Sequence, residues 1–146
     1  MHAIKTVFGI LVCMIAVMSS AVALEVLEGP YSAKVLDVID GDTLAVRARI
    51  WLGTDVDIKV RLAGVDTPET RSRCPEEVRR ARDARQALIA MIGPGDVKLR
   101  DVQYGKYAGR IVARVITPGG ADLSDSLVSQ GHARPYAGGR RSSWCQ

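Results

Sequence analysis

Most of the residues that could perform chemistry lie in three short polar segments of the sequence. These are the segments 39–43 (IDGDT), 61–69 (RLAGVDTPE) and 106–110 (KYAGR). Each segment alone has an ordinary interpretation. The first is typical of a turn, the second of a loop before a helix, and the third of a solvated strand edge. Together they supply several carboxylates and two arginines. Carboxylate oxygens suit a hard metal cation and arginine forks suit a phosphate group, so the combination predicts a site for a cation and a phosphate ester.

The composition of the chain excludes several other kinds of site. The chain has 146 residues, of which 47% are hydrophobic and 25% are charged, as is typical of a globular protein. His132 is the only histidine after residue 23, and the sequence has no CxxC pair. Sites built from two or three histidines, zinc ribbons and thioredoxin-like redox motifs are therefore excluded. The formal net charge of +4 permits a polyanionic partner without requiring one.

Residues 1–23 have the tripartite pattern of a secretory signal peptide. Lys5 gives a positive start, 7–18 is an apolar run, and 19–23 (SSAVA) has small residues at the A-x-A positions. We predict cleavage after Ala23 and a mature protein that is periplasmic or secreted, with no stable membrane association. An uncleaved membrane anchor is the alternative, but the run of 12 residues is shorter than the roughly 20 that span a bilayer.

Export also decides how the remaining cysteines are interpreted. Cys74 and Cys145 are the two cysteines that follow the leader. An even number of cysteines in an oxidising compartment predicts a disulfide, and two free thiols are the alternative. Such a bridge would tie the last residues of the chain to its middle.

Hydrophobic periodicity predicts one domain over 31–146, after a flexible lead-in at 24–30. Alternating apolar residues indicate strands, and Pro75 and Gly93 are placed to bound a long helix. Five short strands with one helix between the third and the fourth are typical of a Greek-key OB-fold barrel, so we predict this mainly β fold with a short C-terminal helix. We expect strands at 31–39, 43–51, 56–65, 96–104 and 110–116, a helix between Asp122 as N-cap and Gly131, and an irregular tail at 132–146.

The three polar segments, in this order and approximate spacing, resemble those of the staphylococcal nuclease (thermonuclease) family. The resemblance extends from about Ala33 to Tyr136, and the segment 127–133 (LVSQGHA) is similar to the family's helix after the barrel. It implies Ca²⁺-dependent hydrolysis of DNA and RNA phosphodiesters with low sequence specificity, which leaves 3′-phosphate and 5′-hydroxyl ends. Nothing in the sequence indicates an oligomer, so we expect a monomer.

The resemblance assigns a cation to the first two segments. Asp42 and Asp66 would bind it together with the backbone carbonyl of Thr67, and Asp40 would act through a neighbouring ligand or a bridging water. All-oxygen ligation that includes a backbone carbonyl suits a hard cation with a flexible shell. Ca²⁺ is therefore the expected ion and Mg²⁺ the second choice.

The same resemblance assigns the remaining residues to the reaction. Glu69 would orient or deprotonate the attacking water, and Arg61 and Arg110 would bind the scissile phosphate and stabilise the charge that grows on it. The residues expected to contact the rest of the substrate are Lys106, Tyr107, Arg134 and Tyr136. For both tyrosines, ordinary packing at the rim of the barrel is the alternative.

One feature separates the third polar segment from the family's most compact pattern. Ala108 adds one residue between Tyr107 and Gly109, which leaves the position of Arg110 open. A Cys74–Cys145 bridge would hold the tail over the barrel, next to the catalytic loop. The alternative function is a catalytically inactive OB-fold module that binds nucleic acid or a protein.

Overall fold

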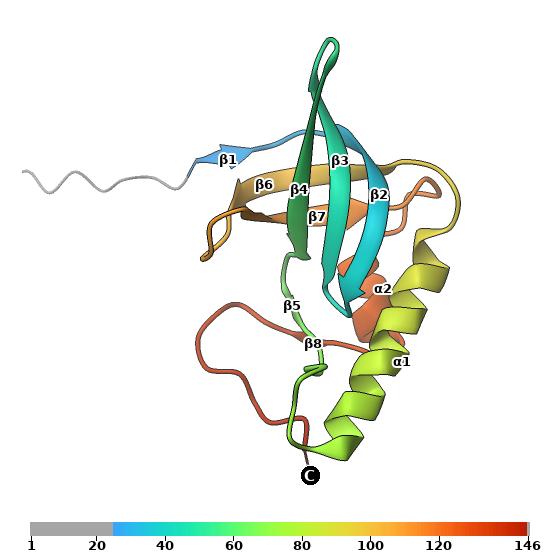
Figure 1. Cartoon of the computed structure of the whole chain (residues 1–146), viewed down its shortest axis with the longest axis vertical. Coiled ribbons are helices and arrows are strands. Elements are labelled where there is room, and N and C mark those ends of the chain that lie inside the picture. The colour runs from blue at the N-terminus through green and yellow to red at the C-terminus, as the bar shows by residue number, and fades with distance from the viewer. Residues whose placement is uncertain (1–24, 146) are drawn as a thin grey trace, which may run out of the picture.

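The computed structural model describes residues 25–145, so the predicted signal peptide at 1–23 lies outside the described residues. No helix in this part of the chain is both long enough and apolar enough to cross a bilayer. Figure 1 shows the elements, which in chain order are β1 (Val26–Leu27), β2 (Tyr31–Asp40), β3 (Thr43–Trp51), β4 (Thr54–Leu62), β5 (Val65–Asp66), α1 (Pro75–Ile92), β6 (Val97–Tyr104), β7 (Arg110–Ile116), α2 (Leu123–Ser129) and β8 (Arg134–Pro135).

Five of the strands close into a barrel. β2, β3 and β4 form an antiparallel meander, and β4 pairs in parallel with β7. β6 pairs antiparallel with both β2 and β7, and this second pairing closes the ring. The helix α1 comes between the meander and β6 in the chain. The prediction of a five-stranded OB-fold barrel with one intervening helix is therefore confirmed.

The alternation of side chains in β3 explains why this segment is a strand of the barrel. Leu44 and Val46 are fully buried in the core, while Arg47 and Arg49 lie on the outer face and form ion pairs with acidic residues of β4. Burial of each such aliphatic side chain contributes roughly 1.5–3 kcal/mol. Ile50 has the same parity as the core residues but is 48% exposed, because the β3–β4 hairpin extends beyond the barrel (Figure 1).

Helix α1 packs one face of small and aliphatic residues against the barrel. It begins with Pro75 directly after its N-cap, ends before Gly93, and buries Ala81, Ala84 and Leu88 completely. Arg85 fixes the position of the helix, because its Nε atom donates a hydrogen bond of 2.7 Å to the carbonyl of Val38 in β2. The helix is thereby held against the end of the barrel where β2 turns into β3.

Helix α2 begins as the sequence predicts. The side chain of Asp122 accepts hydrogen bonds from the backbone N–H groups of Ser124 and Asp125, so this residue is the N-cap. Ser124 Oγ donates a hydrogen bond of 2.8 Å to the carbonyl of Ala63, which connects the helix to the turn after β4.

Three segments differ from the sequence-based prediction. Within the expected flexible lead-in, Val26 and Leu27 pair with β6 as β1. The third predicted strand, 56–65, ends early at Leu62 because Gly64 adopts a φ of +77° and turns the chain. The next two residues form β5, which pairs with β8 inside the tail that was expected to be irregular.

The predicted disulfide between Cys74 and Cys145 is present. Cys74 lies just before α1, so the bridge brings the tail back to the loop that follows β5 (Figure 1).

Candidate active site

A cavity of about 610 Å³ lies where the three polar segments meet. All of the predicted site residues line it except Asp66 and Arg134. The lining therefore contains Asp40, Asp42, Arg61, Thr67, Glu69, Lys106, Tyr107, Arg110 and Tyr136, and also Arg141 from the tail.

The turn between β2 and β3 presents Asp42 to the cavity. Asp40 Oδ1 accepts a hydrogen bond of 3.1 Å from the backbone N–H of Asp42, which fixes the turn, and Thr43 Oγ1 donates to Asp42 Oδ1 at 3.0 Å. Gly41 lets this turn approach its neighbours, since a Cβ atom there would lie 3.0 Å from Thr67 Oγ1 and 3.0 Å from the Cβ of Ala84. Burial, followed by the negative charge of Asp42, raises the pKa of Asp40.

Arg61 lies directly beside this turn. It is paired with Thr43 across the β3–β4 ladder. Its Nη1 atom forms an ion pair with Asp42 Oδ2, and its Nη2 atom donates a hydrogen bond of 3.0 Å to the carbonyl of Val65. The side chains of Arg61 and Asp42 are only 11% and 6% exposed, so this is a buried pair. Arg61 thus connects the first polar segment to the second.

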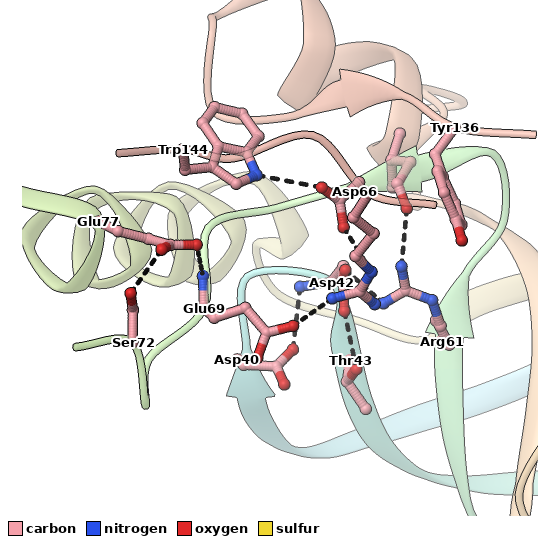
Figure 2. A network of polar contacts seen from close by, with 12 residues as sticks. Asp40, Asp42, Thr43, Arg61, Asp66, Glu69, Ser72, Glu77, Tyr136 and Trp144 are labelled. Atoms are coloured by element: carbon pink, nitrogen blue, oxygen red, sulfur yellow. Dashed lines mark hydrogen bonds and ion pairs between the residues drawn. The ribbon is translucent and has the colours of Figure 1, made fainter. Parts of the chain in front are cut away.

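Asp66 is a buried carboxylate behind the cavity wall. Its Oδ2 atom accepts a hydrogen bond of 3.1 Å from Trp144 Nε1 (Figure 2). Its Oδ1 atom lies 3.0 Å from Nε of Arg141. This contact is an ion pair and not a hydrogen bond, because the N–H group does not point at the oxygen. Among residues 25–145, Asp66 Oδ1 is therefore buried without a hydrogen-bond partner.

Glu69 is held at the mouth of the cavity by the start of α1. Its backbone N–H donates a hydrogen bond of 3.1 Å to Glu77 Oε1, and Ser72 Oγ donates to the other oxygen of the same carboxylate (Figure 2). The side chain of Glu69 is 57% exposed and accepts a hydrogen bond from Nη1 of Arg141. The carboxylate is thus accessible to water on one side and paired with the tail on the other.

The loop before β7 directs Arg110 into the cavity. The backbone N–H of Gly105 donates a hydrogen bond of 3.0 Å to the carbonyl of Arg110, and a Cβ atom on Gly105 would lie 2.5 Å from that oxygen. The guanidinium carbon of Arg110 is 4.9 Å from the centroid of the Tyr107 ring. The additional Ala108 is therefore accommodated within the loop, and Arg110 still lines the cavity.

Of the residues expected to contact the substrate, three lie at the cavity. Lys106 and Tyr107 come from the loop before β7, and Tyr136 comes from the tail, where its OH group donates to the carbonyl of Gly139 at 2.6 Å. Arg134 does not line the cavity and is paired with Asp66 between β8 and β5. Its guanidinium carbon is 3.7 Å from the centroid of the Trp144 ring, and its Nη1 atom donates to the carbonyl of Ser143. Its contact with a phosphate stays a prediction.

Sequence reasoning missed two residues of the tail, Arg141 and Trp144. The only signal was indirect, because Trp144 precedes a cysteine whose partner, Cys74, lies next to the acidic loop. Burial alone would lower the pKa of Arg141, but the charges of Asp66, Glu69 and Asp42 outweigh this effect and raise it. Arg141 is therefore a fixed positive charge among the acidic residues.

The residues present fit a hard divalent cation. Within residues 25–145, no three histidine, cysteine or acidic side chains converge as a ready-made metal site. The carboxylates of Asp42 and Asp66 are each paired with an arginine instead. The buried Oδ1 atom of Asp66 lacks a hydrogen bond, however, and the predicted ligands, which are the carboxylates of Asp42 and Asp66 and the carbonyl of Thr67, would all bind through oxygen. Oxygen ligands of this kind are those that hard divalent cations prefer.

Two comparisons with known proteins agree with this geometry. Residues 59–143 match the model of a family described as "Staphylococcal nuclease homologue". The chain is also 33% identical over 117 residues to a protein named Endonuclease YhcR from Bacillus subtilis (strain 168). The match covers 75% of this chain but only 9% of that relative, so the chain spans a small part of the length of the relative.

Proposed function

Because the chain belongs to the staphylococcal nuclease homologue family, we propose that it is a nuclease that hydrolyses phosphodiester bonds of DNA and RNA in a Ca²⁺-dependent reaction. The observation that carries the proposal is the meeting of Arg61, Glu69 and Arg110 at one cavity beside a buried carboxylate. Arg61 and Glu69 come from the second polar segment and Arg110 comes from the third. Their side chains offer a base and two phosphate-binding groups to one bound ester.

Asp42, Asp66 and the carbonyl of Thr67 would hold the cation in this proposal. Bound Ca²⁺ would neutralise a phosphate oxygen and help to orient the ester for attack. Asp40 would act indirectly, because its carboxylate accepts the backbone N–H of Asp42 and so fixes the position of that ligand.

The chain's own residues would perform the remaining steps. Glu69 would accept a proton from the attacking water, and its exposed carboxylate at the cavity mouth suits this task. Arg61 and Arg110 would donate to the equatorial oxygens of the phosphate as negative charge increases in the five-coordinate transition state. The P–O5′ bond would break, and the leaving oxygen would take up a proton from solvent, which gives 3′-phosphate and 5′-hydroxyl ends.

The rim of the cavity suits a substrate without sequence specificity. Tyr107 is 59% exposed, and Lys106 lies beside its ring. An exposed ring can stack on any base, and a lysine can contact a flanking phosphate, so neither contact reads the sequence.

We also propose that the protein is exported to the periplasm or secreted, after removal of residues 1–23. The disulfide between Cys74 and Cys145 supports this, because such bridges persist in oxidising compartments. Mass spectrometry of the protein recovered outside the cytoplasm tests it, with Leu24 as the expected first residue.

Incubation of the purified protein with single-stranded DNA, with Ca²⁺ or with a chelator, tests the proposed activity. Replacement of Glu69 by glutamine should lower turnover by about 10²- to 10⁴-fold, as expected for loss of a general base. Glu76→Gln is the matched control, because Glu76 pairs with Arg80 on α1 and does not line the cavity. Binding of DNA without cleavage at millimolar Ca²⁺ would instead support the alternative, an inactive binding module.

A further inference from the structure

Arg141 of the C-terminal tail lies against two of the acidic residues that the proposed function needs. Its Nε atom is 3.0 Å from Asp66 Oδ1, the buried oxygen that accepts no hydrogen bond among residues 25–145. Its Nη1 atom donates to Glu69 Oε1. One guanidinium group therefore bridges the proposed cation ligand and the proposed base.

The tail is anchored on both sides of this contact. After Arg141, Trp144 is buried and donates to Asp66 Oδ2, and Cys145 is bonded to Cys74 (Figure 2 shows the contact of Trp144 with Asp66). Before Arg141, the backbone N–H of Tyr136 donates a hydrogen bond of 2.8 Å to the carbonyl of Gly64. A short tether of this kind holds a group at an effective concentration on the order of millimolar.

A guanidinium and a calcium ion cannot both use Asp66 Oδ1. Both are positively charged, and a cation that coordinates Asp66 Oδ1 needs the space beside this oxygen, where Arg141 Nε lies 3.0 Å away. A ligand that binds Asp66 therefore has to displace Arg141, and the free energy of this displacement lowers the apparent affinity for the ligand.

We propose that Arg141 is a tethered competitor of the cation, which occupies Asp66 and Glu69 when Ca²⁺ is absent and leaves them when Ca²⁺ binds. This inference rests on the proposed function, which assigns Ca²⁺ to Asp66. The tail then weakens the calcium site and releases Glu69 for catalysis only when the ion arrives. Weak calcium sites, with Kd values of roughly 10⁻⁴–10⁻³ M, are those of extracellular modules, which matches the proposed export.

The neighbouring Arg140 provides a matched control. It is exposed, and its side chain makes no ion pair or hydrogen bond within the described part of the chain. Arg140→Gln removes the same charge from the same tail as Arg141→Gln does. A general electrostatic effect would change the Ca²⁺ affinity of both variants alike, whereas direct competition changes only the affinity of Arg141→Gln.

Isothermal titration of the oxidised protein with CaCl₂ alone, in the absence of nucleic acid, tests the inference. We expect Arg141→Gln to bind Ca²⁺ at least about 5-fold more tightly than the wild type, the lower end of common coupling between sites. Arg140→Gln should bind Ca²⁺ with the affinity of the wild type, because the ion pairs with Asp66 and Glu69 are made by Arg141. Arg141→Lys keeps the charge but loses the fork, so its affinity should lie between those of the wild type and Arg141→Gln.

Each outcome decides the inference. Tighter binding by Arg141→Gln alone supports it. Equal or weaker binding by Arg141→Gln overturns it while leaving the proposed function intact, because Ca²⁺ still binds. If neither the wild type nor any variant binds Ca²⁺, both the inference and the calcium dependence of the proposed function are wrong. Near-UV circular dichroism of each variant checks that the fold is retained.

Discussion

Replacement of Arg61 by methionine should destabilise the protein strongly, because it leaves a buried carboxylate without its partner. The side chains of Arg61 and Asp42 are 11% and 6% exposed and form an ion pair. Arg61 also donates a hydrogen bond of 3.0 Å to the carbonyl of Val65. Removal of one partner from a buried pair costs about 3–5 kcal/mol. Methionine retains a long apolar stem, so the loss reports on the charge more than on packing.

The same substitution at Arg110 separates this effect from the loss of a phosphate-binding group. Arg110 lines the same cavity, but its buried Nε atom has no hydrogen-bond partner among residues 25–145. Its described interaction is with the ring of Tyr107, and a cation–π contact at a partly exposed site contributes about 0.5–1 kcal/mol. Removal of an unsatisfied donor offsets part of that loss. Arg110→Met should therefore change the stability by no more than about 1 kcal/mol.

Thermal unfolding in the presence of a chelator measures the difference. For a domain of about 120 residues, 1 kcal/mol corresponds to a change in Tm of about 4 °C. Arg61→Met should therefore lower Tm by roughly 12–20 °C and Arg110→Met by no more than about 4 °C. Both variants should lose about 10²- to 10³-fold in turnover of DNA, the usual effect of removing one donor to the transition state. Equal Tm values for the two variants would refute the assignment of Arg61 to a buried pair with Asp42.

Two further changes test the tail. Trp144→Phe removes the donor to Asp66 Oδ2 but keeps an aromatic ring, and it should lower the free energy of unfolding in urea by about 1–3 kcal/mol, because a buried acceptor is left unpaired. Loss of the Cys74–Cys145 bridge in a double serine variant should lower the same free energy by about 4 kcal/mol in the chain-entropy model, since the bridge joins residues 71 positions apart. A loss below about 1 kcal/mol in either case would show that the tail is held by other contacts.

The barrel and both helices were predictable from the sequence because local signals and tertiary packing agree there. The alternation in β3 places Leu44 and Val46 in the core. Pro75 and Asp122 lie at the helix starts that their chemistry favours. The short strands β1, β5 and β8 were not predictable, because each has only two residues and forms through a pairing with a distant segment. Two residues are too few for any periodic pattern.

The residues of the candidate site were likewise predictable only where a local motif marks them. The carboxylates and arginines of the three polar segments were recognisable because each lies in a short motif. Arg141 was not, because an arginine near the end of a chain is usually solvated, and only the fold of the tail brings it to Asp66. Arg134 lies in the same tail, where its guanidinium stacks on Trp144, and its predicted contact with a phosphate stays a prediction.

One half of the site is formed by the barrel and the other half by the tail. These two halves depend on different physical constraints. Sheet register holds the barrel half together, because Thr43 is paired with Arg61 between β3 and β4, and Lys59 is paired with Arg110 between β4 and β7. A one-residue slip in either ladder would turn an arginine away from the cavity and expose core residues, so the register resists change. The tail half depends instead on one covalent bond and a few contacts around Trp144. Changes in the tail can therefore alter the charge around Asp66 without disturbing the barrel.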